Sequence, residues 1–240
     1  MISAARTHIG KVRSSNQDAI LVCPGKYGVY GVADGMGGHK AGDVASKIAV
    51  AVVERALKNE RPTISLLRKA IEEANQAIYE EQLANPDYSG MGTTMTVIWE
   101  DEDRVLLGHV GDSRAYRVRN SAISQVSLDH SMVAEMVRRG LITEDEARVH
   151  PYRNIITRAL GTEPRVEIDT LQLDLRAGDV FFLCSDGLTN HVPEREILRA
   201  VLNDMDWQEK LRHLIGIALE DGGPDNITAM FAIYEEADGR

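Results

Sequence analysis

The chain has 240 residues, enough to bury one substantial core, and its 43% hydrophobic and 27% charged residues are typical of a globular protein. A formal net charge of -10 argues against a nucleic-acid-binding face, which needs clustered lysine and arginine, and disfavours binding to anionic membranes. Metal ions reverse the local field, so an acidic protein can still bind anionic ligands.

Other features of the chain bear on its compartment and its division into domains. The first residues form no apolar run of signal-peptide length, and no segment approaches the roughly 20 apolar residues of a membrane span. We therefore expect a soluble cytoplasmic protein, unless the chain is cut from something longer. Cys23 and Cys184 lie in or beside apolar runs, which favours buried free thiols over a metal or redox role. The absence of repeats and linkers predicts a single domain over residues 1–240.

In chain order, the first predicted elements are two strands and two helices. Apolar, β-branched segments at residues 19–22 and 27–33 indicate the strands. A helical spacing of apolar residues follows Asp43, which we expect to cap it. The next helix is predicted to begin at the capping residue Thr63 and to end at Asn85, before a proline.

The middle of the chain combines strands with a polar insert. Three further strands are predicted over residues 93–99, 104–110 and 115–119. Residues 130–162 carry few large apolar side chains, and Thr143 with Glu146 forms the pattern of a helix capping box. This stretch is therefore expected to be a surface excursion.

The last part of the chain returns to regular elements. A strand over residues 180–184 is followed by a helix with Pro193 in its first turn, then by a helix that Asp206 caps. A final strand is predicted over residues 227–234. Clustered strands with paired helices favour an α+β fold rather than a parallel α/β sheet.

A recurrent feature is an aspartate at the end of an apolar strand, beside glycine or another small residue. These residues are Asp18, Asp34, Asp112, Asp186 and Asp225. Any one of them alone is more simply explained as a turn, because aspartate and glycine both tolerate positive φ. Five together, with a histidine and an arginine nearby, indicate a site.

The chemistry of such a cluster points to hard divalent cations. Neighbouring carboxylates repel one another in a low dielectric and stay ionised together only when cations hold them. Oxygen ligands favour Mg²⁺ or Mn²⁺ over zinc, and the spacing of a calcium-binding EF-hand is absent. The glycines beside Asp34 are expected to let a backbone carbonyl and waters approach the ions.

Six segments then occur in the order of a known family. They are RSSNQD (13–18), VADGMGGH (32–39), GMGTT (90–94), GHVGDSRAY (108–116), CSDGLTN (184–190) and GGPDN (222–226). With them the chain resembles a bacterial metal-dependent protein serine/threonine phosphatase of the type 2C family, in its short single-domain form. The resemblance implies a β-sandwich of two antiparallel sheets with a pair of helices on each outer face. It also implies a flap, at about residues 130–162, next to a metal cleft.

Metal ligands follow from the resemblance residue by residue. Asp34 would bridge two ions, Mn²⁺ or Mg²⁺, and the Gly35 carbonyl would bind the first. Asp186 and Asp225 would bind the second. A third ion, seen in bacterial members, would be held by Asp112 together with Asp186.

Other roles implied by the resemblance concern water, phosphate and protons. Asp18 would lie in the outer shell and hold metal-bound water, and Arg13 would grip the substrate phosphate. His39 matches the histidine proposed to protonate the leaving group, although it could equally hydrogen-bond only to metal-bound water or to the helix start. His109 and His130 are expected to be structural or solvent-facing.

The expected reaction is hydrolysis of phosphoserine and phosphothreonine in proteins. A hydroxide bridging two divalent ions would attack phosphorus in line, without a cysteine nucleophile or a phosphoenzyme. Expected partners are phosphorylated proteins, a Hanks-type Ser/Thr kinase and its substrates. We expect the enzyme to be a monomer that binds neither nucleic acid nor membrane. A non-catalytic pseudophosphatase is the alternative, which the intact acids disfavour. Flap arginines could bind acidic phosphopeptides, although a solvated surface explains them more simply.

Overall fold

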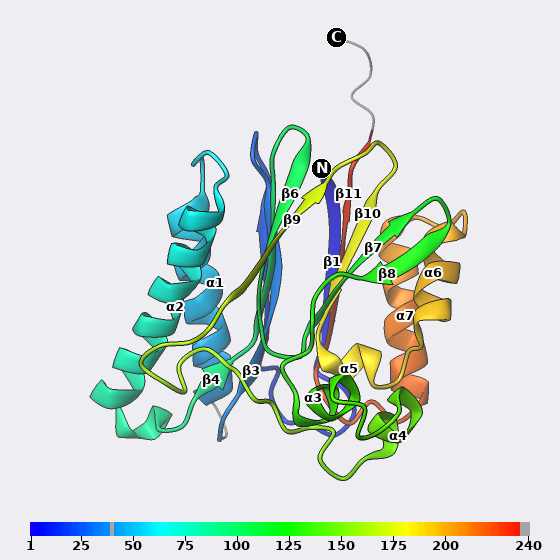
Figure 1. The fold of residues 1–240 in the computed structure, drawn as a ribbon. Coiled ribbons are helices and arrows are strands. Elements are labelled where there is room, and N and C mark those ends of the chain that lie inside the picture. Colours follow the sequence, from blue (N-terminus) through cyan, green and yellow to red (C-terminus); the bar gives the residue numbers. More distant parts are fainter. Residues whose placement is uncertain (39–40, 236–240) are drawn as a thin grey trace.

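Two antiparallel sheets stacked face to face form the centre of the computed structural model, which describes residues 1–38 and 41–235 (Figure 1). The first sheet has the strand order β1 (Ile2–His8), β11 (Ile227–Ile233), β10 (Val180–Cys184), β7 (Arg114–Arg119) and β8 (Ala122–Gln125). The second has the order β2 (Asp18–Cys23), β3 (Val29–Met36), β5 (Met95–Glu100), β6 (Arg104–Val110) and β9 (Asp169–Asp174), and β4 (Gly92–Thr93) pairs with β3. The predicted sandwich of antiparallel sheets is confirmed.

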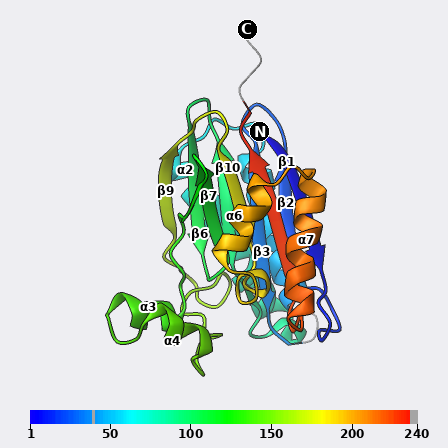
Figure 2. The same cartoon turned by 90° about the vertical axis from the view of Figure 1, so that its right-hand side faces the viewer.

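Helices cover both outer faces of the sandwich. The helices α1 (Ala41–Leu57) and α2 (Ile64–Ala84) pack on the second sheet, and α6 (Glu194–Leu202) and α7 (Trp207–Glu220) pack on the first (Figures 1 and 2). Shorter helices are η1 (Pro86–Tyr88), α3 (Met132–Arg138), α4 (Glu144–Val149) and α5 (Asp186–Thr189). Figure 1 shows α3, α4 and α5 together at the lower end of the layers.

The four layers enclose three apolar cores. Because side chains alternate along a strand, a single strand can contribute residues to two of these cores. Val29 and Ala33 of β3 point toward α1 and α2, whereas Tyr30 and Val32 point toward the other sheet. Successive side chains of a strand face opposite sides, so a strand covered on both sides is apolar at every position. β11 comes close to this pattern, because all seven of its residues are buried and only Thr228 is polar.

Most predicted helix starts agree with the structure, but two differ: Pro193 is the N-cap of α6 and not part of its first turn, and the predicted cap Asp43 lies inside α1. Thr63 caps α2, Asp206 caps α7, and Thr143 with Glu146 forms the capping box of α4. Asp43 is not a cap: α1 already includes Ala41, and Asp43 lies in its first turn, where it pairs with Lys47. An acid in this position still interacts favourably with the positive end of the helix dipole.

Glycines beside Asp34 serve close backbone packing. A Cβ at Gly35 would lie 2.1 Å from the carbonyl oxygen of Gly42 in α1 and 2.5 Å from that of Gln17. The interpretation that these glycines only make room for ions is therefore incomplete, because Gly35 also lets α1 lie directly on β3.

Two further predictions concern the cysteines and membrane spans. Cys23 and Cys184 are both buried and free, as predicted. Within the described chain, no helix combines the length and apolar character needed to cross a bilayer.

Candidate active site

The five aspartates singled out in the sequence come together at one end of the sandwich. Asp18 begins β2 and stands opposite Asp34 in the register of β2 and β3. Asp186 begins α5 directly beyond β10, and Asp225 lies two residues before β11. Asp112 follows β6 by two residues. Figure 1 shows α5 and β3 reaching the same lower end of the molecule as α3 and α4.

Electrostatics show that these carboxyl groups influence one another. Loss of solvent raises the pKa of Asp34 well above its usual range, and the charges of Asp18, Asp186, Asp112 and Asp225 raise it further. Burial likewise raises the pKa of Asp112 and Asp186, with the charge of a neighbouring aspartate as the next cause for each. Such mutual repulsion is relieved either by protons or by a bound cation.

Asp18 is held by a hydroxyl that leaves one of its oxygens unused. Ser185 Oγ donates to Asp18 Oδ2 at 2.9 Å, and the same Oγ accepts from Thr228 N at 3.0 Å. Burial raises the pKa of Asp18 to about 6. In the described part of the chain, Asp18 Oδ1 and Asp112 Oδ1 are buried without a hydrogen-bond partner. Because an unsatisfied buried carboxylate oxygen is costly, these atoms indicate that a ligand belongs there.

The donor set suits a hard divalent cation. It contains only oxygen atoms, which Mg²⁺ and Mn²⁺ prefer as ligands. Asp18 Oδ1 and Asp112 Oδ1, which lack a hydrogen-bond partner, both need a positive or hydrogen-bonding neighbour. Among residues 1–38 and 41–235, however, no three His, Cys, Asp or Glu side chains already stand at the spacing of a metal-ligand cage. The charges of these carboxylates nevertheless act on one another, as the raised pKa of Asp34 shows.

Arg13 lies at this cluster, as its predicted role requires. Its Nη2 donates to Asp225 Oδ2 at 2.7 Å, and its side chain remains 53% exposed. This hydrogen bond raises the pKa of Arg13, and the charges of Asp34 and Asp186 act in the same direction. The guanidinium is thus a permanent cation at the edge of the cluster, open on its other side to solvent.

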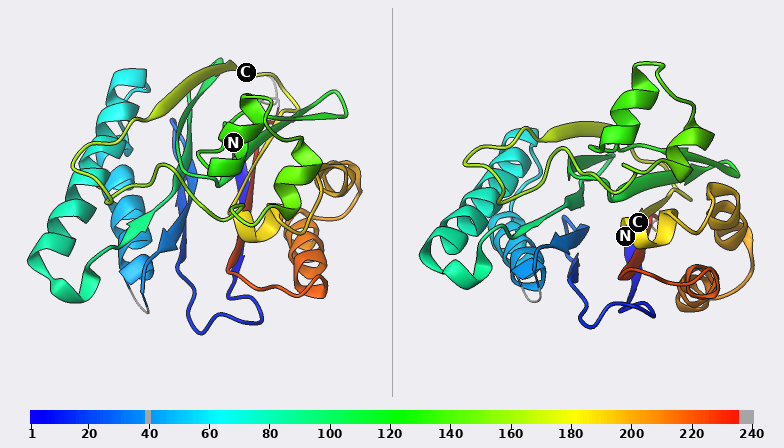
Figure 3. Two further views of the ribbon diagram at one scale, coloured as in Figure 1. Left: turned by 60° about the horizontal axis from the view of Figure 1, so that its bottom comes forward. Right: turned by 90° about the horizontal axis from the view of Figure 1, so that it is seen from below.

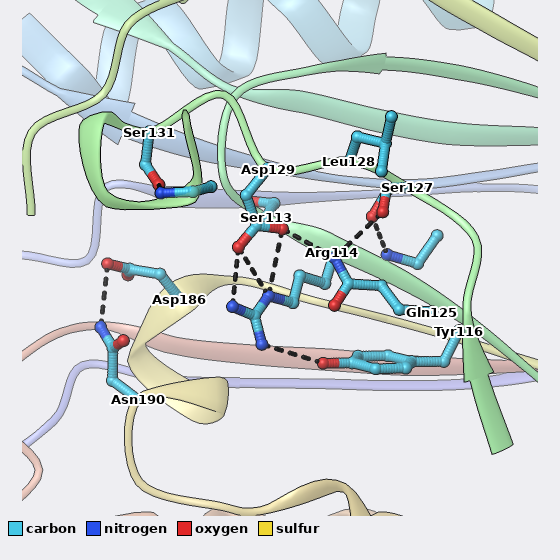
Figure 4. Close-up of polar contacts among 12 residues, drawn as sticks. Ser113, Arg114, Tyr116, Gln125, Ser127, Leu128, Asp129, Ser131, Asp186 and Asn190 are labelled. Carbon is cyan, nitrogen blue, oxygen red and sulfur yellow. Dashed lines mark hydrogen bonds and ion pairs between the residues drawn. The ribbon is translucent and has the colours of Figure 1, made fainter. Parts of the chain in front are cut away.

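α5 fixes the position of Asp186. Asn190 Nδ2 donates to Asp186 Oδ2 at 3.2 Å, a contact drawn in Figure 4. A Cβ at Gly187 would lie 2.0 Å from the carbonyl oxygen of Asn226, so α5 packs directly on the segment that carries Asp225. Two of the predicted ligands are thereby locked to each other through backbone contact.

A partly buried ion pair ties the start of the flap to β7. Arg114 donates to Asp129 from Nε (3.1 Å to Oδ1 and 2.9 Å to Oδ2) and from Nη2 (2.7 Å), and Gln125 Nε2 adds a bond to Asp129 at 2.8 Å (Figure 4). Arg114 Nη1 also reaches Tyr116 Oη at 3.2 Å. Arg114 lies only two positions after Asp112, so the same network fixes the start of the flap close to this aspartate.

Replacing Arg114 by alanine is expected to lower the free energy of unfolding by about 2–4 kcal/mol, because Asp129, whose side chain is only 10% exposed, would lose its cationic partner. Urea unfolding measures the loss. The matched control is Arg117→Ala: its partner Asp174 is 55% exposed, against 10% for Asp129, and we expect a loss below about 1 kcal/mol. Equal losses in the two variants would contradict the structural importance of the Arg114–Asp129 pair.

The two histidines beside the motifs are buried and structural, which is the first of the two roles expected for them; neither faces solvent. His109 Nδ1 contacts Thr96 Oγ1 and its Nε2 contacts Leu128 O, and burial lowers its pKa to about 4. His130 Nδ1 accepts from Gly111 N at 3.0 Å, and its ring lies 4.9 Å from that of His109. Together they join the start of the flap to the loop that carries Asp112.

The remaining predicted residues lie in the flap or outside the described residues. His39 lies outside them, so its role stays a prediction. Four flap arginines are exposed and one is partly buried: Arg138, Arg139, Arg148, Arg153 and, partly buried, Arg158. Arg158 bonds to Asp169 Oδ1 at 3.1 Å and pairs with Glu167, so it anchors the end of the flap to β9.

Sequence reasoning missed the residues that support the site. Ser185, Asp129 and Asn226 each hold a charged group or its loop through buried or partly buried hydrogen bonds. Ser185 and Asn226 are next to predicted metal ligands within the segments CSDGLTN and GGPDN, and this proximity is the one signal in the sequence that points to them. Nothing in the local sequence indicates which distant atoms they contact.

Comparison with known proteins agrees with this geometry. The family model described as protein phosphatase 2C matches residues 6–221. The serine/threonine phosphatase stp of Listeria monocytogenes is 40% identical over 233 residues, which cover 94% of this chain and 92% of that protein.

Solved structures extend the likeness to three dimensions. The crystal structure of the Mycobacterium tuberculosis serine/threonine phosphatase PstP has a TM-score of 0.91 and 39% identity, covering 98% of this chain and 99% of that one. The catalytic domain of PstP in complex with two manganese ions has a TM-score of 0.89 and 36% identity, covering 98% of each chain.

The chain belongs to the protein phosphatase 2C family. It is therefore an enzyme of the phosphatase class, and its α+β sandwich is the fold of its structural relatives, as the motifs predict.

Proposed function

We propose that this protein hydrolyses phosphoserine and phosphothreonine in other proteins, with Mn²⁺ or Mg²⁺ held by the aspartate cluster. The observation that carries the proposal is the convergence of five aspartates and Arg13 at one end of the sandwich. Relatives of closely similar sequence are serine/threonine phosphatases, and one structural relative binds two manganese ions.

The residues that would hold the ions are the aspartates of the cluster, together with one neighbouring backbone carbonyl. Asp34 and the Gly35 carbonyl would serve one ion, Asp186 and Asp225 a second, and Asp112 with Asp186 a third, with Asp18 behind them. When bound, the ions supply an activated water for in-line attack on phosphorus and neutralise charge on the phosphate oxygens.

The chain's own side chains bind and orient the phosphate. Arg13 offers a planar pair of N–H donors beside the carboxylates, which suits two oxygens of one phosphate group. Its present bond to Asp225 occupies one Nη, and the exposed remainder faces solvent. His39 is proposed either to give the leaving oxygen its proton or to support bound water and the helix start.

A cysteine nucleophile has no support in this fold. Cys184 is fully buried, and burial raises the pKa of its thiol well above the usual range, so the reactive thiolate is suppressed. Cys23 is also buried, with a raised pKa for the same reason. Direct attack by water, without a phosphoenzyme, is therefore the proposed route.

The wider setting is part of the same proposal. A single-domain, monomeric enzyme in the cytoplasm would reverse the action of a Hanks-type Ser/Thr kinase on its substrates. The acidic surface charge agrees with a partner that is neither nucleic acid nor an anionic membrane.

The test is release of phosphate from p-nitrophenyl phosphate and from a phosphothreonine peptide, with Mn²⁺ and with excess chelator. We expect turnover that requires the metal and stops with chelator. Turnover that persists in chelator would contradict the mechanism. Metal-dependent peptide binding without phosphate release would instead support the pseudophosphatase alternative.

A further inference from the structure

The loop that carries Arg13 has little apolar anchoring. This Arg13 loop, residues 9–17, joins β1 to β2 without regular structure. Val12 is 71% exposed, and the side chain of Arg13 is 53% exposed. Figure 3 shows the loop in dark blue beside the segment that leads into β11. Since burial contributes little at its tip, polar contacts must set the position of Arg13.

One buried amide makes contacts on both sides of Arg13. Asn226 is 4% exposed, and its Nδ2 donates to Ile9 O at 2.9 Å and to Ser15 O at 3.0 Å. Its Oδ1 accepts from Gln17 N at 2.8 Å. Both N–H donors are used, and each side of the loop is bound to the same side chain.

Asn226 is itself rigidly seated. The carbonyl oxygen of Asn226 lies against Gly187 of α5, where a Cβ would be only 2.0 Å away. The preceding carbonyl, that of Asp225, lies equally close to Gly10 of the loop. Lys11 N adds a bond to Gly223 O at 2.7 Å. The segment before β11 is therefore wedged between α5 and the Arg13 loop.

The backbone of Asn226 reaches the same carboxylate that Arg13 contacts. Its N–H donates to Asp225 Oδ1 at 2.8 Å, while Arg13 donates to Asp225 Oδ2. The side chain of Asn226 thus faces the loop, and its main chain faces the aspartate. A change of side chain leaves the main-chain contact available.

We propose that Asn226 is a positioning residue for phosphate binding: its amide holds the Arg13 loop closed so that the guanidinium stands ready beside the aspartate cluster. The inference rests on the phosphate-binding role proposed for Arg13. Asn226 would act through the loop, because the three hydrogen bonds of its side chain all go to loop backbone atoms. Without its amide the loop gains conformational freedom, and phosphate binding must then bear the cost of ordering it.

A double-mutant cycle tests this, with wild type, Asn226→Ala, Arg13→Ala and the double variant. We measure kcat/KM on a phosphothreonine peptide with Mn²⁺, and binding of inorganic phosphate to the Mn²⁺-loaded protein by calorimetry. We expect Asn226→Ala to lose about tenfold in both quantities with Arg13 present, and less than about twofold in the Arg13→Ala background.

Two further measurements separate this role from general damage. The Mn²⁺ dissociation constant of Asn226→Ala is expected to stay within about twofold of wild type, because the amide acts on the loop and not on Asp225. Asn75→Ala is the matched control: Asn75 is 2% exposed and also bonds two backbone groups, Gly161 N and Glu163 O. Its effect should be the same with and without Arg13.

Several outcomes would overturn the inference. An equal loss from Asn226→Ala in both backgrounds would make the residue merely structural, and a parallel loss of Mn²⁺ affinity would place its effect on Asp225. If Asn226→Ala does not fold, Asn226→Ser, too short to bridge the loop, replaces it. An inactive wild type would refute the proposed function alone, because the phosphate-binding cycle tests the inference without turnover.

Discussion

Replacing Asp34 by asparagine is expected to lower phosphatase turnover by more than about 100-fold, beyond the loss typical of groups that only support a metal ligand. Asp34 is the residue whose pKa responds to all four other aspartates, so it lies at the centre of the cluster. Asparagine keeps its shape but removes the charge that a shared ion requires. Hydrolysis of the phosphothreonine peptide with Mn²⁺ and calorimetric Mn²⁺ binding measure the two effects.

The fold should survive this substitution, because the backbone holds Asp34 independently of its carboxyl group. Asp34 N donates to Thr94 Oγ1 at 2.9 Å, and Asp34 O accepts from Thr94 N and from Thr93 Oγ1, each at 2.9 Å. Unfolding by urea should therefore show a variant at least as stable as the metal-free wild type. Mn²⁺-dependent turnover that survives Asp34→Asn would remove this residue from the mechanism.

A charge-matched control separates the position of the carboxylate from the loss of charge. Asp174→Asn makes the same change at a half-exposed ion pair with Arg119, at the end of β9. Turnover of this variant is expected to stay within about twofold of wild type, since surface ion pairs contribute little. A large loss there would show that net charge, and not the cluster, controls activity.

The sequence reveals the site better than it reveals the edges of the sheets. Five acids beside strand ends are a local pattern, and sheet register then brings Asp18 opposite Asp34. β1, β8 and β9 were not predicted, and each is a sheet edge in the strand order. β1 buries only Ala4, and β9 buries no residue, so neither shows the strict alternation of a half-buried strand.

Contacts across long sequence separations explain the rest of what was missed. Asn226 acts on a loop more than 200 residues away, and Ser185 on an aspartate 167 residues away. Such pairs depend on the closure of the whole sandwich, which no short pattern encodes. Gly35 illustrates the same limit, because the backbone atoms that pack against it belong to α1, and the sequence around Gly35 does not identify them.

Asp18→Asn is expected to stabilise the metal-free protein near pH 7.5, at the expense of activity. Burial raises the pKa of Asp18 from its ordinary 3.8 to about 6 in the folded state. Between about pH 4 and pH 6, the Asp18 carboxyl group therefore holds its proton more strongly in the folded protein than in the unfolded chain. Stability falls as pH rises from about 4 to 6, and the full penalty of about 3 kcal/mol applies above that range.

Asparagine avoids this penalty because it is neutral at every pH and can still accept the bond from Ser185 Oγ. Urea unfolding of wild type and variant without metal, at pH 4 and at pH 7.5, measures the difference. The variant should gain stability at pH 7.5 and lose that advantage at pH 4. A gain that does not change with pH would show that packing, not charge, is responsible.

Asp174 offers a control of opposite sign. Its hydrogen bond with Arg119 lowers its pKa, so its carboxylate contributes stability above pH 4 that disappears as pH falls. Asp174→Asn should therefore be slightly less stable than wild type at pH 7.5.

Saturating Mn²⁺ should shrink the stability advantage of Asp18→Asn over wild type, because a cation relieves in the wild type the same repulsion that asparagine removes. An advantage that Mn²⁺ leaves untouched would mean that Asp18 does not share the field of the metal site.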